Sequence, residues 1–315
     1  MANFQLDDDF LAAIKDLIQK EQDKKLKKQL HELHYADIAE ISEQLTLEEA
    51  IYLVKLLDSE KTADALTEVD EDFREKILRQ LSAKEIAEEL EELDTDDAAD
   101  IIAELPEERQ EKVLSQIEDT EHLKDIRELL KYEEDSAGGL MAKELVKVHE
   151  DLSVLKCVNS MRKQAEEVTR VHSIYVVNAK NQLLGRLSLK DLLTASSKAI
   201  VKDIYIPKVD FVYVDTDVEE VARIMSKYDL EAIPVVNNKK ELLGRITIDD
   251  IVDVIKEEAD KDYQLAAGIS NDVEADDTIL ELTRARLPWL FLGLLGGLGS
   301  VFILKDFETI MNQPQ

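Results

Sequence analysis

A repeat in the middle of the chain is the feature that most restricts its fold. The segment "IYVVNAKNQLLGRLSLKDLL" at 174–193 aligns with "IPVVNNKKELLGRITIDDIV" at 233–252, at a constant offset of 59 residues and with ten of twenty positions identical. Each copy contains a β-branched run, a polar turn, a second run around Leu-Leu-Gly-Arg and a helical pattern, and another helical pattern precedes it. The sequence therefore predicts the unit strand, helix, strand, strand, helix, present twice.

The part before the repeat has a helical pattern throughout. "YADIAEISEQL", "AKEIAEELEEL" and "DDAADIIAELP" place an apolar residue every three or four positions, and Thr46, Ser82 and Thr95 stand where helices are expected to start. Pro106 is the only proline before Pro207. We expect short amphipathic helices stacked into an α-superhelix.

The segment "LPWLFLGLLGGLGSVFIL" at 287–304 has eighteen residues without a charge. As a helix it would cover roughly 27 Å, close to the ~30 Å hydrocarbon thickness of a bilayer. A buried core helix is the alternative, but such a helix rarely has apolar residues on every face. The segment is therefore predicted to be a transmembrane helix. Arg284 and Arg286 before it favour a cell-membrane protein with residues 1–286 on the cytoplasmic side.

The predicted architecture is multidomain and combines three classes of structure. An all-α superhelical domain is followed by an α+β pair and then by a single transmembrane α-helix. The predicted boundaries are 1–135 for the acidic helical domain, 136–200 for the first repeat unit, 201–260 for the second, 261–286 for a connecting helix and 287–304 for the membrane helix.

The charge balance is strongly acidic and restricts the partners. The chain has 70 Asp and Glu against 39 Lys and Arg, a formal net charge of −31. This charge argues against nucleic acid as a partner and favours cations or basic surfaces, although solubility alone would also explain an acidic chain. The single cysteine, Cys157, excludes an internal disulfide and suits a reducing compartment.

The acidic residues are concentrated in one helical stretch. Between Glu85 and Glu111 there are thirteen carboxylates and one basic residue, Arg109, so the charge is not balanced within the stretch. Asp96 and Asp100 are four positions apart and are expected on one helix face, where like charges destabilise a helix by a few tenths of a kcal/mol. A cation that bridges them would remove this cost.

A second acidic group belongs to the second repeat. Asp249, Asp250 and Asp253 open a predicted helix, and Asp229 ends the one before it, whereas the first copy has only Asp191 at the equivalent place. Acidic residues at a helix N-terminus are also ordinary dipole partners. Oxygen ligands without His or Cys suit Mg²⁺ or Ca²⁺, and no EF-hand spacing is present. We therefore expect a magnesium site where the two acidic groups meet.

Motifs for catalysis are absent from the sequence. There is no Walker A loop, no G-x-S-x-G, no H-E-x-x-H and no pair of cysteines. The five histidines are scattered, and the "HELH" segment at 31–34 is interpreted as surface histidines. We expect a protein that is not an enzyme.

The segment "YEEDSAGGLM" at 132–141 joins the helical part to the repeat. It contains Gly138 and Gly139 in a chain with only nine glycines. Because glycine reaches backbone conformations that other residues avoid, the pair is interpreted as a hinge between two domains.

These residues together resemble the MgtE family of magnesium transporters and channels. The junction segment is similar to that of the family, the duplicated "VVN…LLGR…D" units resemble a tandem CBS pair, and the order of the parts is the same. The resemblance implies a homodimer that associates through its CBS domains and a cytosolic part that senses Mg²⁺ to gate a pore. It also places the pore-forming helices outside this chain.

The resemblance implies ligands at matching positions of this sequence. Those of the helical domain are Asp96, Asp100 and the backbone of Gly139. Those of the second repeat unit are Asp217, Glu219, Asp229, Asp250 and Asp253. Those near the membrane connection are Glu258 and Asp262. Lys261 stands where an acid is expected, and Leu230 where the family has a nucleotide-stacking aromatic residue. Lys190 and Asp191 match the nucleotide-binding positions of CBS pairs, so ATP or another adenine nucleotide is the second expected ligand.

The resulting hypothesis is a magnesium-controlled switch. Regulatory Mg²⁺ would bridge the acidic helix to the second repeat unit and favour a closed pore, and its loss would let the carboxylates repel each other. A membrane-tethered adenine-nucleotide sensor and a scaffold without any ligand are the two alternatives.

Overall fold

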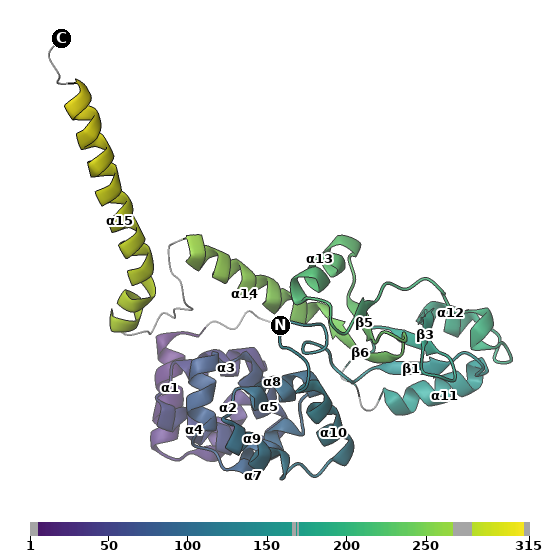
Figure 1. Ribbon diagram of the computed structural model, residues 1–315. Coiled ribbons are helices and arrows are strands. Elements are labelled where there is room, and N and C mark those ends of the chain that lie inside the picture. Colours follow the sequence, from purple (N-terminus) through teal and green to yellow (C-terminus); the bar gives the residue numbers. More distant parts are fainter. Residues whose placement is uncertain (1–5, 166–167, 169, 267–278, 312–315) are drawn as a thin grey trace. The chain divides into compact units, whose positions relative to one another are not determined.

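The structure is a computed structural model that describes residues 6–165, 168, 170–266 and 279–311, with some side chains within the last two helices also left undescribed (Figure 1). The chain divides into two compact units, Met1–Thr247 and Ile248–Gln315. Each unit is described by itself.

Ten helices form the described part of the N-terminal region, as the sequence predicts. Their bounds are α1 Asp8–Gln19, α2 Asp23–Leu30, α3 Tyr35–Glu43, α4 Leu47–Leu56, α5 Ser59–Glu68, α6 Glu71–Leu78, α7 Ala83–Leu90, α8 Thr95–Ala103, α9 Glu107–Leu114 and α10 Thr120–Leu129.

The helix starts follow from side-chain capping. Thr46 caps α4 and Ser82 caps α7, each in a capping box with the glutamate three residues later. Both residues confirm the predicted starts. Thr95 is the first residue of α8 rather than its cap, because Asp94 takes the cap position with extended backbone. The Asp94 side chain makes no capping hydrogen bond to α8 and instead accepts a hydrogen bond from the Arg245 guanidinium.

The helices stack in rows in which each contacts the next but one along the chain. Helix α3 packs on α5, α5 on α7 and α7 on α9, while α4 packs on α6 and α8 on α10. Side chains about thirty residues apart also make contact: the hydrogen bond from Ser59 Oγ to the Glu88 carbonyl at 3.1 Å joins α5 to α7, and the Lys55–Glu85 ion pair at 2.7 Å joins α4 to α7. The first hundred-odd residues thus form an all-helical layered domain, with Ile, Leu and Ala side chains buried between the rows.

The two repeat units have the predicted order of elements. The first consists of β1 Val146–His149, α11 Val154–Gln164, β2 Ile174–Val177, β3 Leu183–Leu187 and α12 Leu189–Thr194. The second consists of β4 Val212–Tyr213, α13 Val218–Tyr228, β5 Ala232–Val236 and β6 Leu242–Thr247, and a short 3₁₀ turn, Val201–Asp203, lies between the units. In each unit the first strand pairs parallel with the second, and the second pairs antiparallel with the third.

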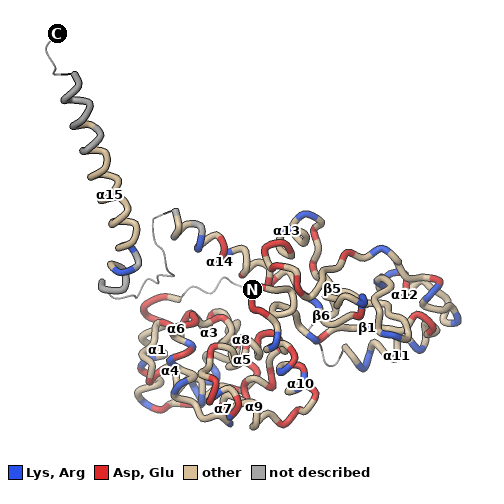
Figure 2. Tube along the Cα trace, in the orientation of Figure 1, with Lys and Arg blue, Asp and Glu red and all other residues tan. Residues whose placement is uncertain are grey.

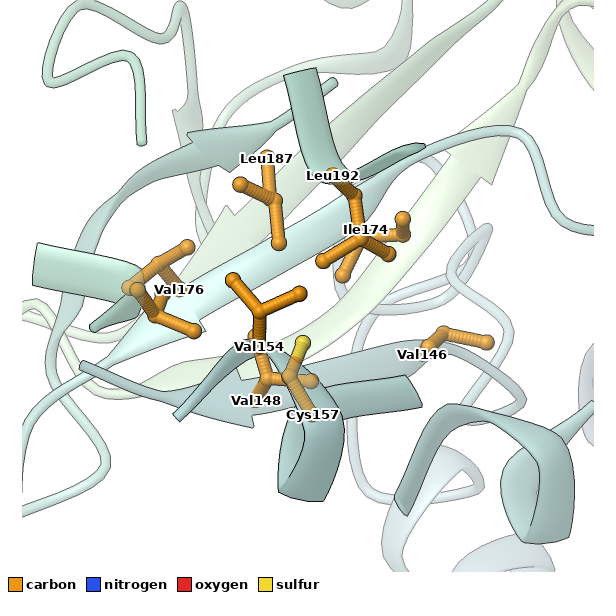
Figure 3. Close-up of a cluster of buried hydrophobic side chains, with 9 residues drawn as sticks. Val146, Val148, Val154, Cys157, Ile174, Val176, Leu187 and Leu192 are labelled. Carbon is orange, nitrogen blue, oxygen red and sulfur yellow. The ribbon is translucent and has the colours of Figure 1, made fainter. Parts of the chain in front are cut away.

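The core of the first unit lies between its sheet and its helices (Figure 3). Ile174 and Leu187 from the sheet, Val154 and Cys157 from α11 and Leu192 from α12 are all buried there. Cys157 therefore acts as a small apolar side chain, and burial raises the pKa of its thiol.

In each repeat unit, a segment from outside the unit pairs with the last strand of the sheet. Ala142 pairs with Arg245 of β6 through two backbone hydrogen bonds, and Ile206 pairs with Arg186 of β3 in the same way. The segment before the first unit therefore adds to the sheet of the second, and the segment between the units adds to the sheet of the first. Arg186 and Arg245 are equivalent positions of the repeat.

The Gly138-Gly139 pair has a packing role. Neither glycine has a left-handed φ angle. A Cβ on Gly138 would lie 2.7 Å from side-chain atoms of Tyr132 and Val214, and one on Gly139 would lie 2.6 Å from the Glu133 carbonyl oxygen. The amide of Gly138 donates to the Val214 carbonyl at 2.9 Å. Close packing thus accounts for the two glycines without any left-handed backbone, and the predicted hinge stays a prediction.

The described part of the second compact unit, Ile248–Gln315, consists of α14 Ile248–Ala266 and α15 Ile279–Met311. The predicted connecting helix at 261–286 overlaps both, and residues 267–278 lie outside the described part of the chain. Helix α15 contains the predicted membrane segment with Pro288 inside it, and the apolar side chains described there are exposed, Leu290 by 66%. Among the described residues no helix meets the length and hydropathy that a membrane span requires, so the predicted span is not confirmed.

Candidate functional site

Three carboxylates converge where the helical domain meets the segment between α10 and β1. This segment leads into the first repeat unit and is called the leading segment. Asp94 and Asp96 come from the start of α8, and Glu144 comes from the leading segment. One oxygen of each lies within 4.8 Å of the others, and Asp96 is buried while its two neighbours are half-buried. Among the described residues this is the one group of His, Cys, Asp and Glu whose spacing would suit a metal ion. Hard oxygen ligands of this kind suit Mg²⁺ or Ca²⁺.

Hydrogen bonds already fix this group of carboxylates. The Glu144 carboxylate accepts from the Thr95 amide at 3.3 Å and from the Thr95 hydroxyl at 2.9 Å, so it caps the first turn of α8. The Arg245 guanidinium donates to Asp94 at 3.3 Å. We call the set Asp94–Asp96, Lys143, Glu144 and Arg245 the seam, since it joins the helical domain to the leading segment and to β6.

A second acidic group surrounds Asp100, one turn further along α8. Burial of the carboxyl raises the pKa of Asp100 most, and the nearby carboxylates of Asp97, Glu134 and Glu104 raise it further, to about 7. The Asp100 side chain is nevertheless open to solvent, so a cation could reach it. Asp96 belongs to the group with Asp94 and Glu144, whereas Asp97, Glu134 and Glu104 are the carboxylates that act on Asp100. That one cation bridges Asp96 and Asp100 stays a prediction.

Gly139 lies beside this second group. Its Cβ position would be 2.9 Å from the Glu134 carbonyl oxygen, and Glu134 is one of the carboxylates that act on Asp100. The Gly139 amide donates to the Ser136 carbonyl at 3.0 Å. Glu134 is therefore a neighbour of both Asp100 and Gly139, and their place in one metal site stays a prediction.

The acidic stretch at 85–111 is partly neutralised by residues from outside it. Acidic residues are spread over helices α1–α10 (Figure 2), but Lys55 pairs with Glu85 and Arg127 pairs with Glu111. Arg74 forms a bidentate pair with Glu104, and both side chains are nearly buried. Helix stacking thus brings cations from about thirty residues away or less to these three glutamates, so the fold balances part of the charge that is not balanced within the stretch.

The predicted ligands on the second repeat unit divide between the two ends of α13. Asp217 caps the N-terminus and accepts from the Glu219 amide at 2.9 Å, and both side chains are exposed. Asp229 ends the helix in a left-handed conformation, with φ 51°. The helix has eleven residues, so its ends are roughly 16 Å apart. Asp217 and Asp229 cannot ligate the same ion within one chain.

The remaining predicted ligands lie in α14, which belongs to the second compact unit. Asp250 is half-buried in the first turn and Asp253 is exposed one turn later. Glu258 pairs with Lys261 at 3.1 Å, so the lysine that replaces an expected acid holds a neighbouring ligand candidate. The side chain of Asp262 lies outside the described part of the chain. Lys190 and Asp191 are in the first turn of α12, with Lys190 exposed.

Comparison with known families separates the same parts of the chain. The model for the MgtE intracellular N domain matches residues 33–135, and the CBS domain model matches 137–198 and 201–257. A solved structure, the cytosolic domain of the Mg²⁺ channel MgtE in complex with ATP, is 34% identical with a TM-score of 0.72, and the match covers 78% of this chain and 99% of that one. The chain belongs to the MgtE family.

Two further relatives give the same result. The magnesium transporter MgtE of Thermus thermophilus is 39% identical over 189 residues, which are 59% of this chain and 42% of the relative. The soluble part of a magnesium transporter is 29% identical with a TM-score of 0.70, over 79% of this chain and 98% of that one. The matched region thus spans less than half of the curated relative. These relatives are a channel and transporters, which agrees with the expectation of a protein that is not an enzyme.

Sequence reasoning missed four residues of the candidate site. Asp94 and Glu144 complete the group around Asp96, Glu134 stands beside Asp100, and Arg245 pairs with Asp94. Glu134 is inside the junction segment "YEEDSAGGLM" and could have been found there. Glu144 and Arg245 are far from α8 in the sequence, and no local pattern connects them to it.

Proposed function

We propose that the chain is the cytosolic Mg²⁺-sensing and gating part of an MgtE-type magnesium transporter. Mg²⁺ bound between acidic residues of the helical domain and of the CBS pair would favour the closed state of a pore. The observation that carries this proposal is the convergence of Asp94, Asp96 and Glu144 within 4.8 Å, at the start of an acidic helix in a chain whose relatives are magnesium transporters.

The physical basis of the switch is differential affinity for two arrangements. Burial has the largest effect on the Asp100 carboxyl, and the carboxylates of Asp97, Glu134 and Glu104 raise its pKa further, although Arg74 lowers it. A divalent ion stabilises the arrangement that gathers such carboxylates, because it binds that arrangement more tightly than the open one. When the ion leaves, repulsion favours separation. Magnesium keeps several waters when bound, and this suits the solvent-exposed Asp100.

Isothermal titration of the chain with Mg²⁺ tests this function. Asp96→Ala combined with Asp100→Ala is expected to remove most of the binding heat, without any dependence on ATP. Glu107→Ala combined with Glu108→Ala is the matched control, because these exposed glutamates begin α9 and removing them changes the net charge equally. Equal loss of heat in both variants would show only non-specific charge screening, and the proposal would fail.

We also propose a homodimer that forms through the CBS pair. The repeat presents exposed apolar side chains at equivalent positions, 59 residues apart. Leu193 is 76% exposed and Val252 is 55% exposed, while Leu189 and Ile248 are 59% and 38% exposed. Exposed apolar side chains at repeated positions on helices are typical of an interface, and a second copy would present the same surface.

Nucleotide binding is a second candidate function, favoured by the solved relative that is in complex with ATP. Lys190 and Asp191 open α12 of the first CBS unit, where a lysine and a carboxylate would contact phosphate and ribose. Titration with ATP tests this role. Asp191→Ala and Lys190→Ala are expected to weaken binding at least tenfold, whereas Lys198→Ala, an exposed lysine of the same unit, is expected to leave it unchanged.

The location of the chain follows as part of the same proposal. Residues 287–304 would anchor it in the cell membrane, with residues 1–286 on the cytoplasmic side. The uncharged sequence of this segment and the helix α15 that contains it support the proposal. Glycosylation-site or cysteine-accessibility mapping of both ends in intact cells would decide it. Labelling of both ends from the same side would count against it.

A further inference from the structure

A pocket with a largely basic lining lies between α2 and the start of α5. It encloses about 260 Å³. Helix α2 and the turn after it supply Lys27, Lys28, His31 and Glu32, and the connection from α4 into α5 supplies Leu57, Asp58 and Lys61. Three lysines and a histidine thus line one small space in a chain whose net charge is −31.

Helix α2 carries positive charge that its surroundings do not neutralise. Its eight residues include four lysines and one aspartate. Lys27 forms a long ion pair with Asp58, at 3.7 Å, in which both side chains are exposed. Lys24, Lys25 and Lys28 are also exposed and have no ion pair with the residues that the structure describes. In a strongly acidic chain, this helix is a local reversal of charge that favours an anion.

The spacing of these side chains places several of them on one face of α2. Lys24, Lys28 and His31 follow each other at intervals of four and three residues, so they lie in one row along the helix. Like charges at this spacing destabilise a helix slightly. An anion bound at this face would remove that repulsion.

The helix dipole does not account for the lysines of α2. Cations in a last turn are ordinary partners of the final carbonyl groups, yet the Lys61 ammonium already donates to the carbonyls of His31 and Leu33, to the latter at 3.3 Å. Lys24 and Lys25 stand in the first turn, where the dipole disfavours positive charge. The lysines therefore call for another partner.

The size and chemistry of the pocket indicate the class of that partner. Pockets that enclose drug-sized ligands have roughly 300–1,000 Å³, so this one suits a smaller molecule. Its cations are lysines without any arginine. Lysine ammonium groups are compact charges that bind phosphate well, whereas the planar arginine fork is the better match for a carboxylate. The His31 imidazole can supply a further N–H donor to an oxygen.

We infer that this pocket binds a phosphate group, with Lys27 and Lys28 contacting its oxygens while Lys61 fixes the end of α2. The match to the MgtE intracellular N domain begins at residue 33, so α2 precedes the region that the family model describes. None of the lining residues belongs to the carboxylate groups around Asp96 and Asp100. The site therefore does not depend on the proposed Mg²⁺ sensor.

Titration calorimetry of the full chain with inorganic phosphate tests this site, in a neutral detergent and in chloride buffer freed of divalent ions. Lys27→Gln combined with Lys28→Gln is expected to weaken binding at least tenfold. Lys20→Gln combined with Lys25→Gln is the matched control, because both lysines are exposed, neither lines the pocket, and the loss of charge is equal. This control is expected to stay within twofold of the unsubstituted chain. Absence of phosphate binding in the unsubstituted chain, or equal weakening in both double variants, would overturn the inference.

A variant that strengthens binding guards against a simple folding defect. Glu32 is exposed, lines the pocket and has no ion pair with the residues that the structure describes. Glu32→Gln removes a repulsive charge and is expected to tighten phosphate binding at least threefold, which a damaged fold would not do. Glu40→Gln, at an exposed residue of α3 outside the pocket, is the control. If Glu32→Gln binds phosphate no more tightly than Glu40→Gln, phosphate does not occupy this pocket.

Two further probes distinguish a dissolved phosphate compound from a lipid headgroup. Glycerol 3-phosphate is a soluble phosphate monoester, and glycerophosphoglycerol is the diester headgroup of phosphatidylglycerol. The monoester is expected to bind more tightly, because it offers more negative charge to the lysines. Tighter binding of the diester, lost in Lys27→Gln with Lys28→Gln, would identify a lipid headgroup as the source of the phosphate group. If neither probe depends on these two lysines, the site is wrong.

Magnesium titration of the same double variant separates this inference from the proposed function. Lys27→Gln with Lys28→Gln is expected to keep the Mg²⁺ binding of the unsubstituted chain, since these lysines are not among the candidate ligands. Loss of phosphate binding with Mg²⁺ binding intact supports the pocket whether or not the sensor is correct. Loss of both in this variant would indicate a general defect and would count against the pocket.

Discussion

Gly244 lies directly against the backbone of Ala142, so that a Cβ on Gly244 would be 2.5 Å from the Ala142 carbonyl oxygen. Gly244→Ala would push the leading segment away from β6 and is expected to lower the free energy of unfolding by about 1–3 kcal/mol, as overpacking does. Chemical denaturation measures this loss. Gly293→Ala is the control, because a Cβ there meets nothing within 4 Å. Equal stability of both variants would contradict the close contact.

Arg74 is expected to be essential to the helical domain. Its side chain is 13% exposed, pairs with Glu104 and also donates to the carbonyls of Leu66, Thr67 and Val69. Arg74→Ala leaves a nearly buried carboxylate without its cation, which costs about 3–5 kcal/mol. Urea denaturation is the measurement. Arg79→Ala, which removes an exposed pair with Glu75, is expected to cost less than about 1 kcal/mol.

The raised pKa of Asp100 predicts a dependence of stability on pH. Its carboxyl has a folded pKa of about 7 against an ordinary value of 3.8, so between these values the folded chain holds a proton that the unfolded chain releases. The stability of the chain therefore falls as pH rises through this range. Asp100→Asn is expected to reduce the fall, measured as the melting temperature between pH 5 and 8 without divalent ions. An unchanged pH profile would contradict this assignment.

The same carboxyl predicts competition between protons and Mg²⁺. Since a metal ion needs the deprotonated form, the affinity for Mg²⁺ is expected to be weaker at pH 6 than at pH 8. Asp100→Asn is expected to weaken binding at pH 8 and to remove most of the difference. Titration calorimetry with Mg²⁺ at pH 6 and pH 8 measures this difference. A pH dependence of the affinity that remains in Asp100→Asn would point to another group.

Self-association is expected to depend on the exposed helix faces of the CBS pair. Leu193→Asp places a charge on a side chain that is 76% exposed and is expected to weaken dimerisation at least tenfold without changing the melting of the monomer. Sedimentation velocity over a range of protein concentrations measures this. Val171→Asp, at a residue 43% exposed in the loop before β2, is the control. Equal weakening of dimerisation in both variants would contradict a specific interface at these helix faces.

The repeat allowed much of the fold to be predicted, because local patterns determine local structure. The alternation around "VVN" and "LLGR" indicated the strands, and Thr46 and Ser82 indicated helix starts through their side-chain caps. The glycine pair at 138–139 was recognised as special, but its packing was not predicted. Gly138 leaves room for the side chains of Tyr132 and Val214, and Val214 is far from it in the sequence.

The candidate site could be predicted only in part for the same reason. The four-residue spacing places Asp96 and Asp100 on one side of α8, but it does not say what covers each of them. Asp96 is buried beside Glu144 whereas Asp100 is exposed beside Glu134. Arg186 and Arg245 stand in the same sequence context, so no local pattern distinguishes the exposed residue from the buried one.

The exchange of leading segments between the two CBS units has a consequence for how such a pair can evolve. Each copy of the duplicated unit lacks one edge of its own sheet and borrows it from chain that precedes the other copy. A cut between residues 200 and 201 would therefore yield two incomplete halves rather than two domains. Once a duplication has become interlocked in this way, neither copy can be deleted, and the two must change together.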